Sequence, residues 1–370
     1  MQIGTVTEIK KHEYRVGLTP NNVRDLTADG ASIFVQEGAG IGAGFTDAEY
    51  IAAGASMKGS AAEVFDECEL IIKVKEPQTA EISLLKPHHT LFTYLHLAPD
   101  IEQTESLLHS GATAIAYETV TDTHGRLPLL TPMSEVAGRV AIQAGAYMLQ
   151  KACGGRGVLL GGVPGVEAGD VLIIGGGVVG THAAKMAVGL GAQVTMLDTS
   201  LNRLRELDDL FGSRVRTLFS SPAVLEHAIT CADLVVGAVL IPGAKTPHLV
   251  KKHQLSSMRP GAVLVDVAID QGGCFETSKA TTHDLPVYTV DGVQHYCVAN
   301  MPGATPRTST VALTNATMPF IRAIAKTNPI TAMQQNAHLK NGLNIFSGQL
   351  TCAAVAQAQG KSSVSLDSVL

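Results

Sequence analysis

Four ionisable side chains in the first half of the sequence stand where they could act together on one small molecule. Arg15 in EYRVGLTP, Lys75 in KVKEP, His96 in YLHLA and Glu118 in AYETV each lie at or just after the carboxyl end of an expected strand. Ligands of an open parallel sheet bind beyond the carboxyl ends of its strands, so we expect these side chains on one rim. A single charged residue at a strand end is most often solvated and without function, but four on one rim indicate a binding site.

The chemistry that these residue types allow is that of a small 2-amino or 2-oxo acid. Arginine holds a carboxylate through two charge-assisted hydrogen bonds. Lysine can polarise a keto oxygen or hold the second oxygen of the carboxylate. His96 is best interpreted as the acid and base, because imidazole moves protons near neutral pH. In the second half, Asp270 ends the run GAVLVDVAID and precedes Gly272 and Gly273. The same rim is therefore expected to receive an aspartate that could activate water or ammonia.

The elements that must position these residues are strands alternating with helices. Short apolar runs separated by helical patterns are typical of parallel sheets covered on both faces. Within 90–97 the side chains alternate, which places His96 near the end of a buried strand that Pro99 terminates. Thr19 and Pro20 mark the start of a helix. The expected strands are 3–9, 31–38, 69–77, 90–97, 112–120, 171–177, 192–198, 232–239, 261–270 and 285–293.

A nucleotide-binding motif opens the second half in VLIIGGGVVGTHAAKMAVGLGAQVTMLD. Gly175, Gly177 and Gly180 form G-x-G-x-x-G directly after an apolar strand and at the start of a helical pattern. The first glycine allows the tight turn, the second lets the backbone approach a pyrophosphate, and the third allows close helix–strand packing. The phosphates are expected on the N–H groups at the helix N-terminus.

The acid that ends the next strand indicates which dinucleotide is bound. Asp198 lies 18 residues beyond Gly180, where a carboxylate accepts hydrogen bonds from the adenosine ribose. A 2′-phosphate would meet a like charge there, so the motif favours NAD. Arg203 is near enough to leave NADP open, with a solvated helix residue as its alternative. The glycine run 161–166 precedes the strand and is interpreted as a loop.

These patterns predict an α/β protein of two Rossmann-like, doubly wound parallel-sheet domains with an active-site cleft between them. Residues 1–128 and 305–370 are expected to form a discontinuous substrate domain, and 129–304 an NAD-binding domain. The segment 134–151 is expected to be one long helix that bridges them.

Composition bounds the class of protein. The 370 residues are 45% hydrophobic and 16% charged, with 37 glycines and a net charge of −6, which suits two apolar cores and argues against nucleic-acid binding. No apolar stretch is long enough to span a membrane, and the amino-terminal segment lacks the apolar core of a secretory signal. The six cysteines are scattered singly without zinc-ligand spacing, so we expect reduced thiols and a cytoplasmic protein.

The sequence resembles a known family over essentially its whole length. The segments MQIGTVTEIKKHEYRVGLTP, KVKEP, YLHLA, GGGVVG, VDVAIDQGG and MPGATPRTST are similar to those of the L-alanine dehydrogenases, which share a lineage with the nucleotide-binding component of transhydrogenase. The resemblance implies NAD-dependent, reversible oxidative deamination of L-alanine to pyruvate, ammonium and NADH. It also implies a homo-hexamer.

The resemblance also implies roles for individual residues. Arg15 and Lys75 would bind the substrate, His96 and Asp270 would form the catalytic pair, and Glu118 and Met133 would line the substrate pocket less directly. Some relatives hold a metal on a late helix, but FIRAIAKTN offers neither acid nor histidine, so no metal site is expected. On the cofactor side the resemblance points to Ser134, Val178, Val179, Asp198, Arg203, Ser220, Val239, Leu240, Val267, Ala268, Ile269, Asp270, Lys279, Val298, Ala299, Asn300 and Met301.

Three other functions compete with this one. The soluble nucleotide-binding component of a proton-translocating transhydrogenase shares the two-domain plan, but as the resemblance goes it lacks the histidine and aspartate found here at 96 and 270. Saccharopine-type dehydrogenases are a more distant rival with a roomier substrate pocket. A non-catalytic NAD-binding subunit would bind the cofactor without turnover. In that case the presence of Arg15, Lys75, His96 and Asp270 would be a coincidence.

Overall fold

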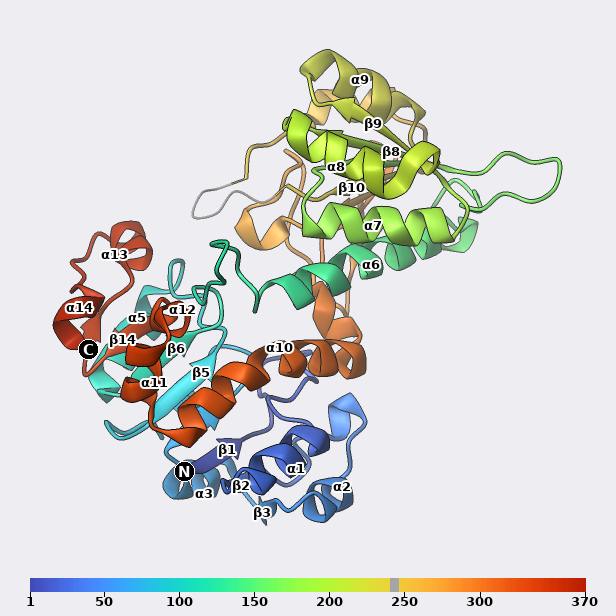
Figure 1. Cartoon of the computed structure of the whole chain (residues 1–370). Helices are drawn as coiled ribbons and strands as arrows, with labels where there is room; N and C mark the ends of the chain where they lie inside the picture. The colour runs from blue at the N-terminus through green and yellow to red at the C-terminus, as the bar shows by residue number, and fades with distance from the viewer. Residues whose placement is uncertain (240–245) are drawn as a thin grey trace. The chain divides into compact units, whose positions relative to one another are not determined.

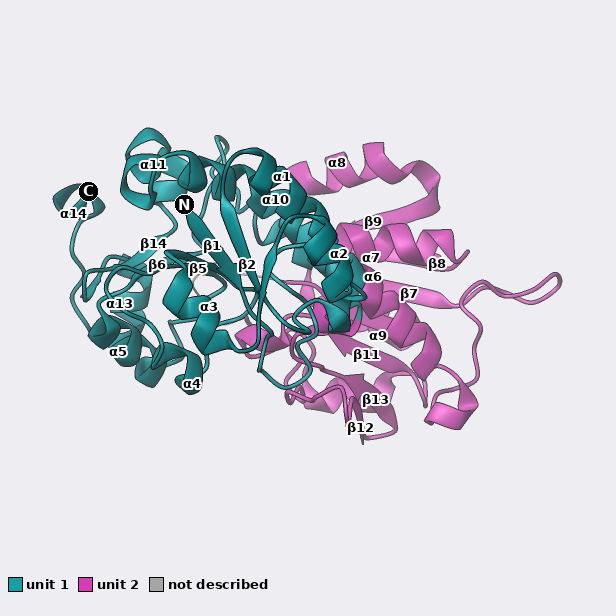
Figure 2. Ribbon diagram, turned by 90° about the horizontal axis from the view of Figure 1, so that it is seen from below, with its two compact units in different colours: residues 1–133, 305–370 teal, residues 134–304 magenta. Residues whose placement is uncertain are grey.

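The computed structural model describes residues 1–239 and 246–370, which divide into two compact units. Unit 1 comprises Met1–Met133 and Thr305–Leu370, and unit 2 comprises Ser134–Ala304 (Figure 2). Each unit is an α/β structure built on one mostly parallel sheet. The predicted fold class is thereby confirmed, while the cleft between the domains stays a prediction.

The sheet of unit 1 has the strand order β15-β14-β6-β5-β4-β1-β2-β3. Strands β1 to β6 are parallel, whereas β14 is antiparallel to β6 and β15 is antiparallel to β14. The order reverses between β1 and β4, which is the topological switch point of a doubly wound sheet. The strands are β1 (Gln2–Thr5), β2 (Ser32–Gln36), β3 (Ser56–Lys58), β4 (Leu70–Ile72), β5 (Thr90–Thr93), β6 (Thr113–Ala116), β14 (Leu343–Phe346) and β15 (Gln349–Leu350).

The helices of unit 1 pack on this sheet (Figure 1). The first begins as predicted, because the Thr19 hydroxyl accepts from the Asn22 N–H and Pro20 occupies the first turn. Every residue of β4 and β5 is buried, as apolar strands covered on both faces must be. The helices are α1 (Pro20–Ala28), α2 (Asp47–Ala52), α3 (Ala61–Glu67), α4 (Thr79–Ile82), α5 (Ile101–Ser110), α10 (Pro306–Lys326), α11 (Pro329–Gln335), α12 (Ala337–Lys340), α13 (Ala353–Gln359) and α14 (Leu366–Val369).

The sheet of unit 2 has the order β12-β13-β11-β10-β7-β8-β9 and is parallel except for β12. Its order reverses between β7 and β10, so this sheet also has one switch point. The strands are β7 (Asp170–Ile174), β8 (Gln193–Asp198), β9 (Val215–Phe219), β10 (Leu234–Gly237), β11 (Val263–Asp266), β12 (Val287–Val290) and β13 (Val293–Tyr296). The α-helices are most of α6 (Thr131–Met148), together with α7 (Val178–Gly189), α8 (Leu201–Phe211) and α9 (Pro222–Cys231).

Several predicted boundaries were wrong. The strand expected over 285–293 is instead a hairpin of β12 and β13, with Asp291 and Gly292 at positive φ in its turn. The sequence reading also missed β3, β9, β14 and β15, three of which lie at sheet edges. The long helix is α6 (Thr131–Met148), which begins and ends three residues before the expected 134–151.

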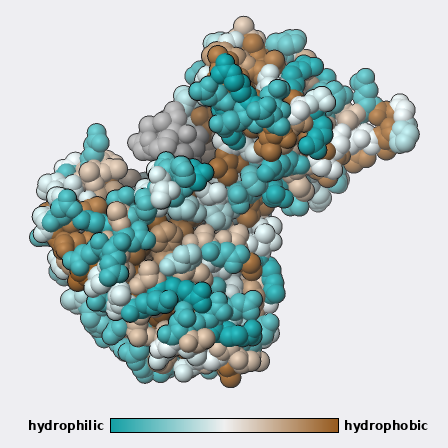
Figure 3. All heavy atoms as spheres, viewed as in Figure 1, coloured by the Kyte–Doolittle hydropathy of each residue, from teal (hydrophilic) through white to brown (hydrophobic). Residues whose placement is uncertain are grey.

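The glycine run before β7 belongs to a segment that projects from unit 2 (Figure 1). Val163 and Val166 form an antiparallel bridge across its tip, so the expected loop is a short hairpin. Leu159, Val163 and Val166 are all exposed, and Figure 3 shows hydrophobic atoms along this projection. An exposed apolar group of this kind is typical of an interaction surface.

Candidate active site

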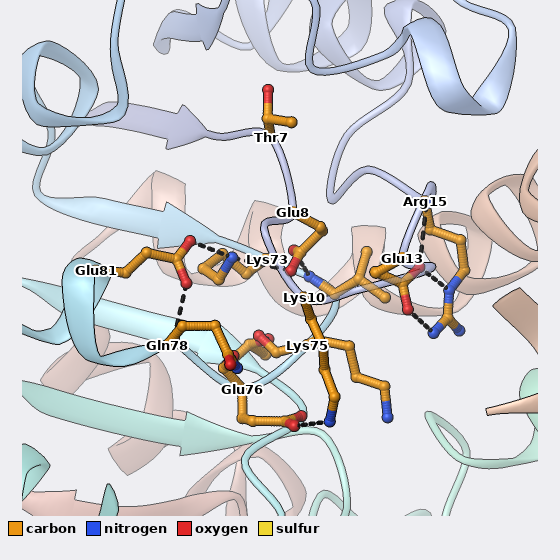
Figure 4. A network of polar contacts seen from close by, with 12 residues as sticks. Thr7, Glu8, Lys10, Glu13, Arg15, Lys73, Lys75, Glu76, Gln78 and Glu81 are labelled. Carbon is orange, nitrogen blue, oxygen red and sulfur yellow. Dashed lines mark hydrogen bonds and ion pairs between the residues drawn. The ribbon is translucent and has the colours of Figure 1, made fainter. Parts of the chain in front are cut away.

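The candidate substrate site begins at the switch point of unit 1. The chain leaving β1 carries Glu8, Glu13 and Arg15, and the chain leaving the adjacent β4 carries Lys73 and Lys75 (Figure 4). Neighbouring parallel strands that depart in opposite directions leave a crevice at their carboxyl ends. The fold therefore brings these charged side chains to one edge, as the sequence predicted for Arg15 and Lys75.

A buried ion cluster ties the two loops together. Lys73 Nζ lies 2.9 Å from Glu8 Oε2 and 2.6 Å from Glu81 Oε1, and all three side chains are buried. The other Glu8 oxygen accepts from the Val74 N–H at 2.6 Å. Burial raises the pKa of Glu8, although the charge of Lys73 opposes the rise. Burial alone would lower the pKa of Lys73, but its two carboxylates outweigh burial and raise it.

Arg15 is held by a second buried ion pair. Its Nε and Nη2 donate to the two oxygens of Glu13 at 2.6 and 2.5 Å, and its Nη1 donates to Met133 Sδ at 2.9 Å. The arginine side chain is 2% exposed, so burial works to lower its pKa, but the hydrogen bonds and charge of Glu13 raise it. The Met133 thioether is a weak hydrogen-bond acceptor, so a carboxylate could replace it as the partner of Arg15 Nη1.

His96 does not lie in a strand, contrary to the sequence prediction. β5 ends at Thr93, because its neighbours β4 and β6 end opposite Phe92 and Thr93. The Tyr94 N–H still donates to the Val74 carbonyl at 3.3 Å, and the N–H groups after it, of Leu95 and His96, both donate to Glu118 Oε1 at 2.8 Å. His96 has φ of 49°, a left-handed conformation that is uncommon for histidine. A carboxylate, rather than Pro99, therefore turns the chain out of the sheet.

The His96 ring lies between a cation and an anion. Its Nε2 is 3.3 Å from Lys75 Nζ, and its Nδ1 is 3.4 Å from Glu118 Oε1. Tyr94 stacks on the ring with centroids 5.9 Å apart. An ammonium has only protons to donate, so we assign the neutral imidazole a lone pair on Nε2 and the proton on Nδ1, facing Glu118. The structure thus joins three of the predicted residues into one contact chain.

Glu76 adds a further negative charge beside this chain. It is buried and pairs with Lys10, while its Oε2 has no hydrogen-bond partner among the described residues (Figure 4). Burial alone would raise the pKa of Glu76, but Lys75, then Lys10 and His96, outweigh burial and lower it. The rim therefore carries nearly balanced charges of both signs at close range.

In unit 2 the three motif glycines differ in what surrounds them. At Gly175, where φ is 101°, a Cβ would lie 2.6 Å from the Ala238 carbonyl oxygen, and at Gly180 a Cβ would lie 1.9 Å from the Gly175 oxygen. At Gly177 a Cβ would meet no atom within 4 Å. The first and third glycines are thus required by turn and packing, whereas the second faces open space at the N-terminus of α7.

Asp198 and Arg203 support the glycine loop. Asp198 Oδ2 accepts from the Gly176 N–H at 2.7 Å, and Oδ1 accepts from the Ser200 N–H at 2.8 Å. Arg203 Nε donates to the Gly176 carbonyl at 2.7 Å, and its Nη2 donates to the Thr181 hydroxyl at 2.8 Å. Arg203 is therefore bound to the loop, unlike the solvated helix residue that the sequence left as an alternative.

The remaining residues expected at the cofactor follow the carboxyl ends of parallel strands, except for four. Val178 and Val179 lie in the first turn of α7, Ser134 lies in α6, and Lys279 is exposed in a loop. Leu240 lies outside the described residues. The others follow strands β9, β10, β11 and β13 and comprise Ser220, Val239, Val267, Ala268, Ile269, Asp270, Val298, Ala299, Asn300 and Met301.

Asp270 does not end a strand, contrary to the sequence prediction. β11 ends at Asp266, and Asp270 lies four residues later in the 3-10 turn Ile269–Gln271, exposed to solvent. The apolar run continued past the strand because Val267, Ala268 and Ile269 pack in the loop. Asp270 therefore stands on a loop at the carboxyl edge of unit 2.

Three buried carboxylates that hold loops at the sheet edges of the two units were not predicted from the sequence. Glu8, Glu13 and Asp266 are buried and bond both backbone and side chains, yet each looks like an ordinary acid in the sequence. A signal existed for Glu13, because an acid two residues before a buried arginine can reach it. The ion pair of Lys73 with Glu8 has no such signal in the sequence, because the two residues are 65 positions apart.

The described residues contain neither a metal-binding cluster nor a membrane-spanning helix. Within residues 1–239 and 246–370, no group of three or more His, Cys, Asp or Glu side chains is arranged to hold a metal ion. In the same part of the chain, no helix is both long and apolar enough to cross a membrane.

Together these features define a two-unit α/β protein with a dinucleotide-type glycine loop in one unit and a paired-charge site in the other. Residues 4–137 match the family described as "Alanine dehydrogenase/PNT, N-terminal domain", and residues 141–353 match "Alanine dehydrogenase/PNT, C-terminal domain". The chain belongs to the alanine dehydrogenase/PNT family, which confirms the resemblance found in the sequence.

Individual relatives cover nearly the whole chain. The chain is 58% identical to "Alanine dehydrogenase" of Halomonas elongata over 97% of both chains, and 53% identical to that of Bacillus subtilis over 97% of this chain and 95% of the relative. A solved "L-alanine dehydrogenase" superposes with a TM-score of 0.95 at 52% identity, covering 97% of this chain and 99% of the other. A transhydrogenase from Sinorhizobium meliloti gives 0.82 at 25% identity, covering 96% and 100%.

Proposed function

We propose that this chain catalyses the reversible, NAD-dependent oxidative deamination of L-alanine to pyruvate, ammonium and NADH. Unit 1 is the substrate domain and unit 2 is the NAD-binding domain. The observation that carries the proposal is the contact of Lys75 Nζ with His96 Nε2 on the edge that also presents Arg15. That set suits a small acid whose α-carbon changes between amine and ketone.

The Arg15 site suits a carboxylate. Glu13 fixes the guanidinium in the plane of its own carboxyl group, so little side-chain freedom remains to be lost when a ligand binds. The Nη1 partner, Met133 Sδ, is a weak acceptor. A substrate carboxylate would replace a weak hydrogen bond by a strong, charge-assisted one. Met133 then lies beside the bound substrate.

The glycine loop suits the pyrophosphate of NAD. The open space at Gly177 and the N–H groups at the start of α7 form the cradle that a pyrophosphate requires. Each Asp198 oxygen accepts one backbone N–H and has a second lone pair, which can receive a ribose hydroxyl. The carboxylate and the engaged guanidinium of Arg203 disfavour the extra phosphate of NADP.

The residues of unit 1 then have distinct tasks in the reaction. Bound NAD⁺ supplies the acceptor for the hydride that leaves the alanine α-carbon. Lys75 holds and polarises the oxygen that becomes the keto group of pyruvate, and the lone pair on His96 Nε2 accepts a proton from the water that adds to the imine carbon. The same proton is returned to the amino group of this adduct. The C–N bond then breaks as the hydroxyl of the adduct gives up its proton, and the released ammonia takes up that proton to become ammonium. Asp270 is the second acid and base.

The amino group must be neutral before its α-carbon can lose hydride, so alanine oxidation is expected to be faster at alkaline pH.

We further propose a cytoplasmic homo-hexamer. The exposed apolar side chains Leu159, Val163 and Val166 on the projecting hairpin support self-association.

The test is NADH formation from NAD⁺ and L-alanine at alkaline pH, followed by absorbance. L-serine, glycine, saccharopine and NADP⁺ are run beside it. His96→Ala is expected to lose turnover by about a hundredfold or more, as removal of a general base does. The matched control is His109→Ala, which removes an exposed histidine from the end of α5 and should retain activity.

Other outcomes point to the competing functions. NADH binding without turnover of any amino acid would overturn the proposal in favour of a non-catalytic subunit. Hydride exchange between nucleotides without amino-acid turnover would favour a transhydrogenase component, the function named for the Sinorhizobium meliloti structure. Preference for saccharopine would indicate a larger substrate pocket.

A further inference from the structure

Asp266 is a buried carboxylate to which the reaction scheme gives no task. It is the last residue of β11, is 0% exposed, and its pKa is raised by burial although four hydrogen bonds oppose the rise. Within residues 1–239 and 246–370, no lysine, arginine or histidine pairs with it. Its partners are donors from one loop, namely the N–H groups of Ala268 (3.1 Å), Cys274 (2.9 Å) and Phe275 (3.4 Å), the Ser278 hydroxyl (2.5 Å) and the Cys274 thiol (3.5 Å).

These donors lie at both ends of the segment 267–278. Asp266 Oδ1 binds the start of the segment at Ala268, and Oδ2 binds its end at Cys274, Phe275 and Ser278. The segment therefore closes into a loop around one carboxyl group. An unpaired carboxylate is costly to bury, so a sequence under no other demand would place an apolar residue here.

The return of the loop is built around the same carboxylate. Gly273 has φ of 78°, and a Cβ there would lie 2.7 Å from Asp266 Oδ2. Any other residue would be strained and would also push against the carboxylate. Gly272 has φ of 92° and ends the 3-10 turn that precedes it.

The tip of this loop carries Asp270. Its side chain is exposed, and in the described part of the chain no hydrogen bond or ion pair holds its carboxylate. The position of that carboxylate is therefore set by the backbone of the 3-10 turn Ile269–Gln271. That turn is fixed through Ala268 on one side and through Cys274 on the other.

We propose that Asp266 is a positioning residue, which holds the loop 267–278 closed and thereby places the Asp270 carboxylate for catalysis. The part that concerns catalysis rests on the proposed function, because it needs Asp270 to act on the substrate. The part that concerns the loop rests only on the contacts of Asp266.

Asp266→Asn tests the proposal with almost no change in volume. An amide has one oxygen, so if that oxygen takes the place of Oδ2, its NH₂ group faces the Ala268 N–H, and two donors then oppose each other. The expected result is faster amide hydrogen exchange in peptides that cover 267–278, and a fall of kcat for alanine of about tenfold or more, as small misplacements of reacting groups cause.

Asp233→Asn is the matched control in the same unit. Asp233 is 3% exposed and accepts from the Asp170 N–H at 2.9 Å and from Arg259 at 3.0 Å, just before β10. It lies at the amino end of the sheet, so its loss should lower the melting temperature while kcat stays within about twofold of wild type. An equal loss of kcat in this control would show that general loosening, and not the Asp266 loop, causes the effect.

A double-mutant cycle distinguishes positioning from a purely structural role. If Asp266 acts through Asp270, then adding Asp266→Asn to Asp270→Asn should cost less than about twofold in kcat, since the group to be positioned is already gone. Multiplicative losses, or unchanged hydrogen exchange in 267–278, would overturn the proposal. If the wild-type chain shows no alanine-dependent turnover, the proposed function fails, while the exchange experiment still decides whether Asp266 closes the loop.

Discussion

Replacing Gly177 and Gly180 by alanine should separate cofactor binding from folding. A Cβ at Gly177 would meet no atom within 4 Å, and the residue has φ of −65°, which alanine adopts without strain. A Cβ at Gly180 would lie 1.9 Å from the Gly175 carbonyl oxygen, which is well inside any real contact. The two substitutions add the same methyl group to the same loop, so their difference reports what surrounds each position.

The expected magnitudes follow from these distances. In Gly180→Ala the start of α7 must move away from β7 by more than an ångström, and overpacking of this kind costs about 1–3 kcal/mol. For a unit of this size that lowers the melting temperature by about 2–12 °C. Gly177→Ala should change the free energy of unfolding by less than about 1 kcal/mol. Its methyl group would occupy the space of the pyrophosphate, so the NADH dissociation constant should rise by about tenfold or more.

Thermal melts without cofactor and NADH fluorescence titrations measure the two quantities separately. Gly189→Ala, at the exposed end of α7 where a Cβ also meets no atom within 4 Å, is the control and should change neither. Wild-type NADH affinity in Gly177→Ala would refute the placement of the pyrophosphate. A large drop in its melting temperature would refute the description of Gly177 as facing open space.

Three further substitutions test unit 1. Glu118→Gln should lower kcat for alanine about tenfold with little change in KM, because Glu118 contacts the backbone N–H and Nδ1 of His96. Steady-state kinetics measure both constants. A raised KM with an unchanged kcat would instead make Glu118 a substrate contact. Glu13→Gln should lower the free energy of unfolding in urea by about 3 kcal/mol or more, since the buried Arg15 guanidinium loses its carboxylate, and a loss below about 1 kcal/mol would contradict this. Burial lowers the pKa of His89, so the unfolded chain binds more protons below the ordinary value of 6.5 and stability should fall as the pH drops below it. Urea unfolding should show a shallower pH dependence in His89→Asn, and an unchanged slope would exclude this histidine as the cause.

The glycine loop of unit 2 could be predicted because the residues that form it are contiguous. Strand β7, the three glycines, α7, β8 and Asp198 follow one another within 29 residues, and each has a local sequence signal. The candidate substrate site of unit 1 draws on loops that follow four different strands. The position of these loops at one edge of the sheet could be predicted from the fold class. The ion pairs between their side chains could not, because Glu8 and Lys73, for example, are 65 residues apart in the sequence.

Strand ends were the least predictable feature, and they decide where the residues proposed to be catalytic lie. Apolar alternation continues past Thr93 to Leu97, so sequence periodicity cannot show that β5 stops when its neighbours stop. The same is true of β11, where the apolar run continues for three residues beyond Asp266. In both places most of the apolar residues beyond the strand are buried in a loop, so their composition resembles that of a buried strand.

One physical device explains both failures. At the carboxyl edges of the sheets, a carboxylate takes the backbone N–H groups that a longer strand would have given to its neighbour. Glu118 accepts from Leu95 and His96, and Asp266 accepts from Ala268. An acid at a strand end is therefore not always a ligand for substrate or a solvated charge. Here each acid binds the backbone where the chain leaves the sheet, and a residue proposed to be catalytic, His96 or Asp270, lies in the segment that it holds.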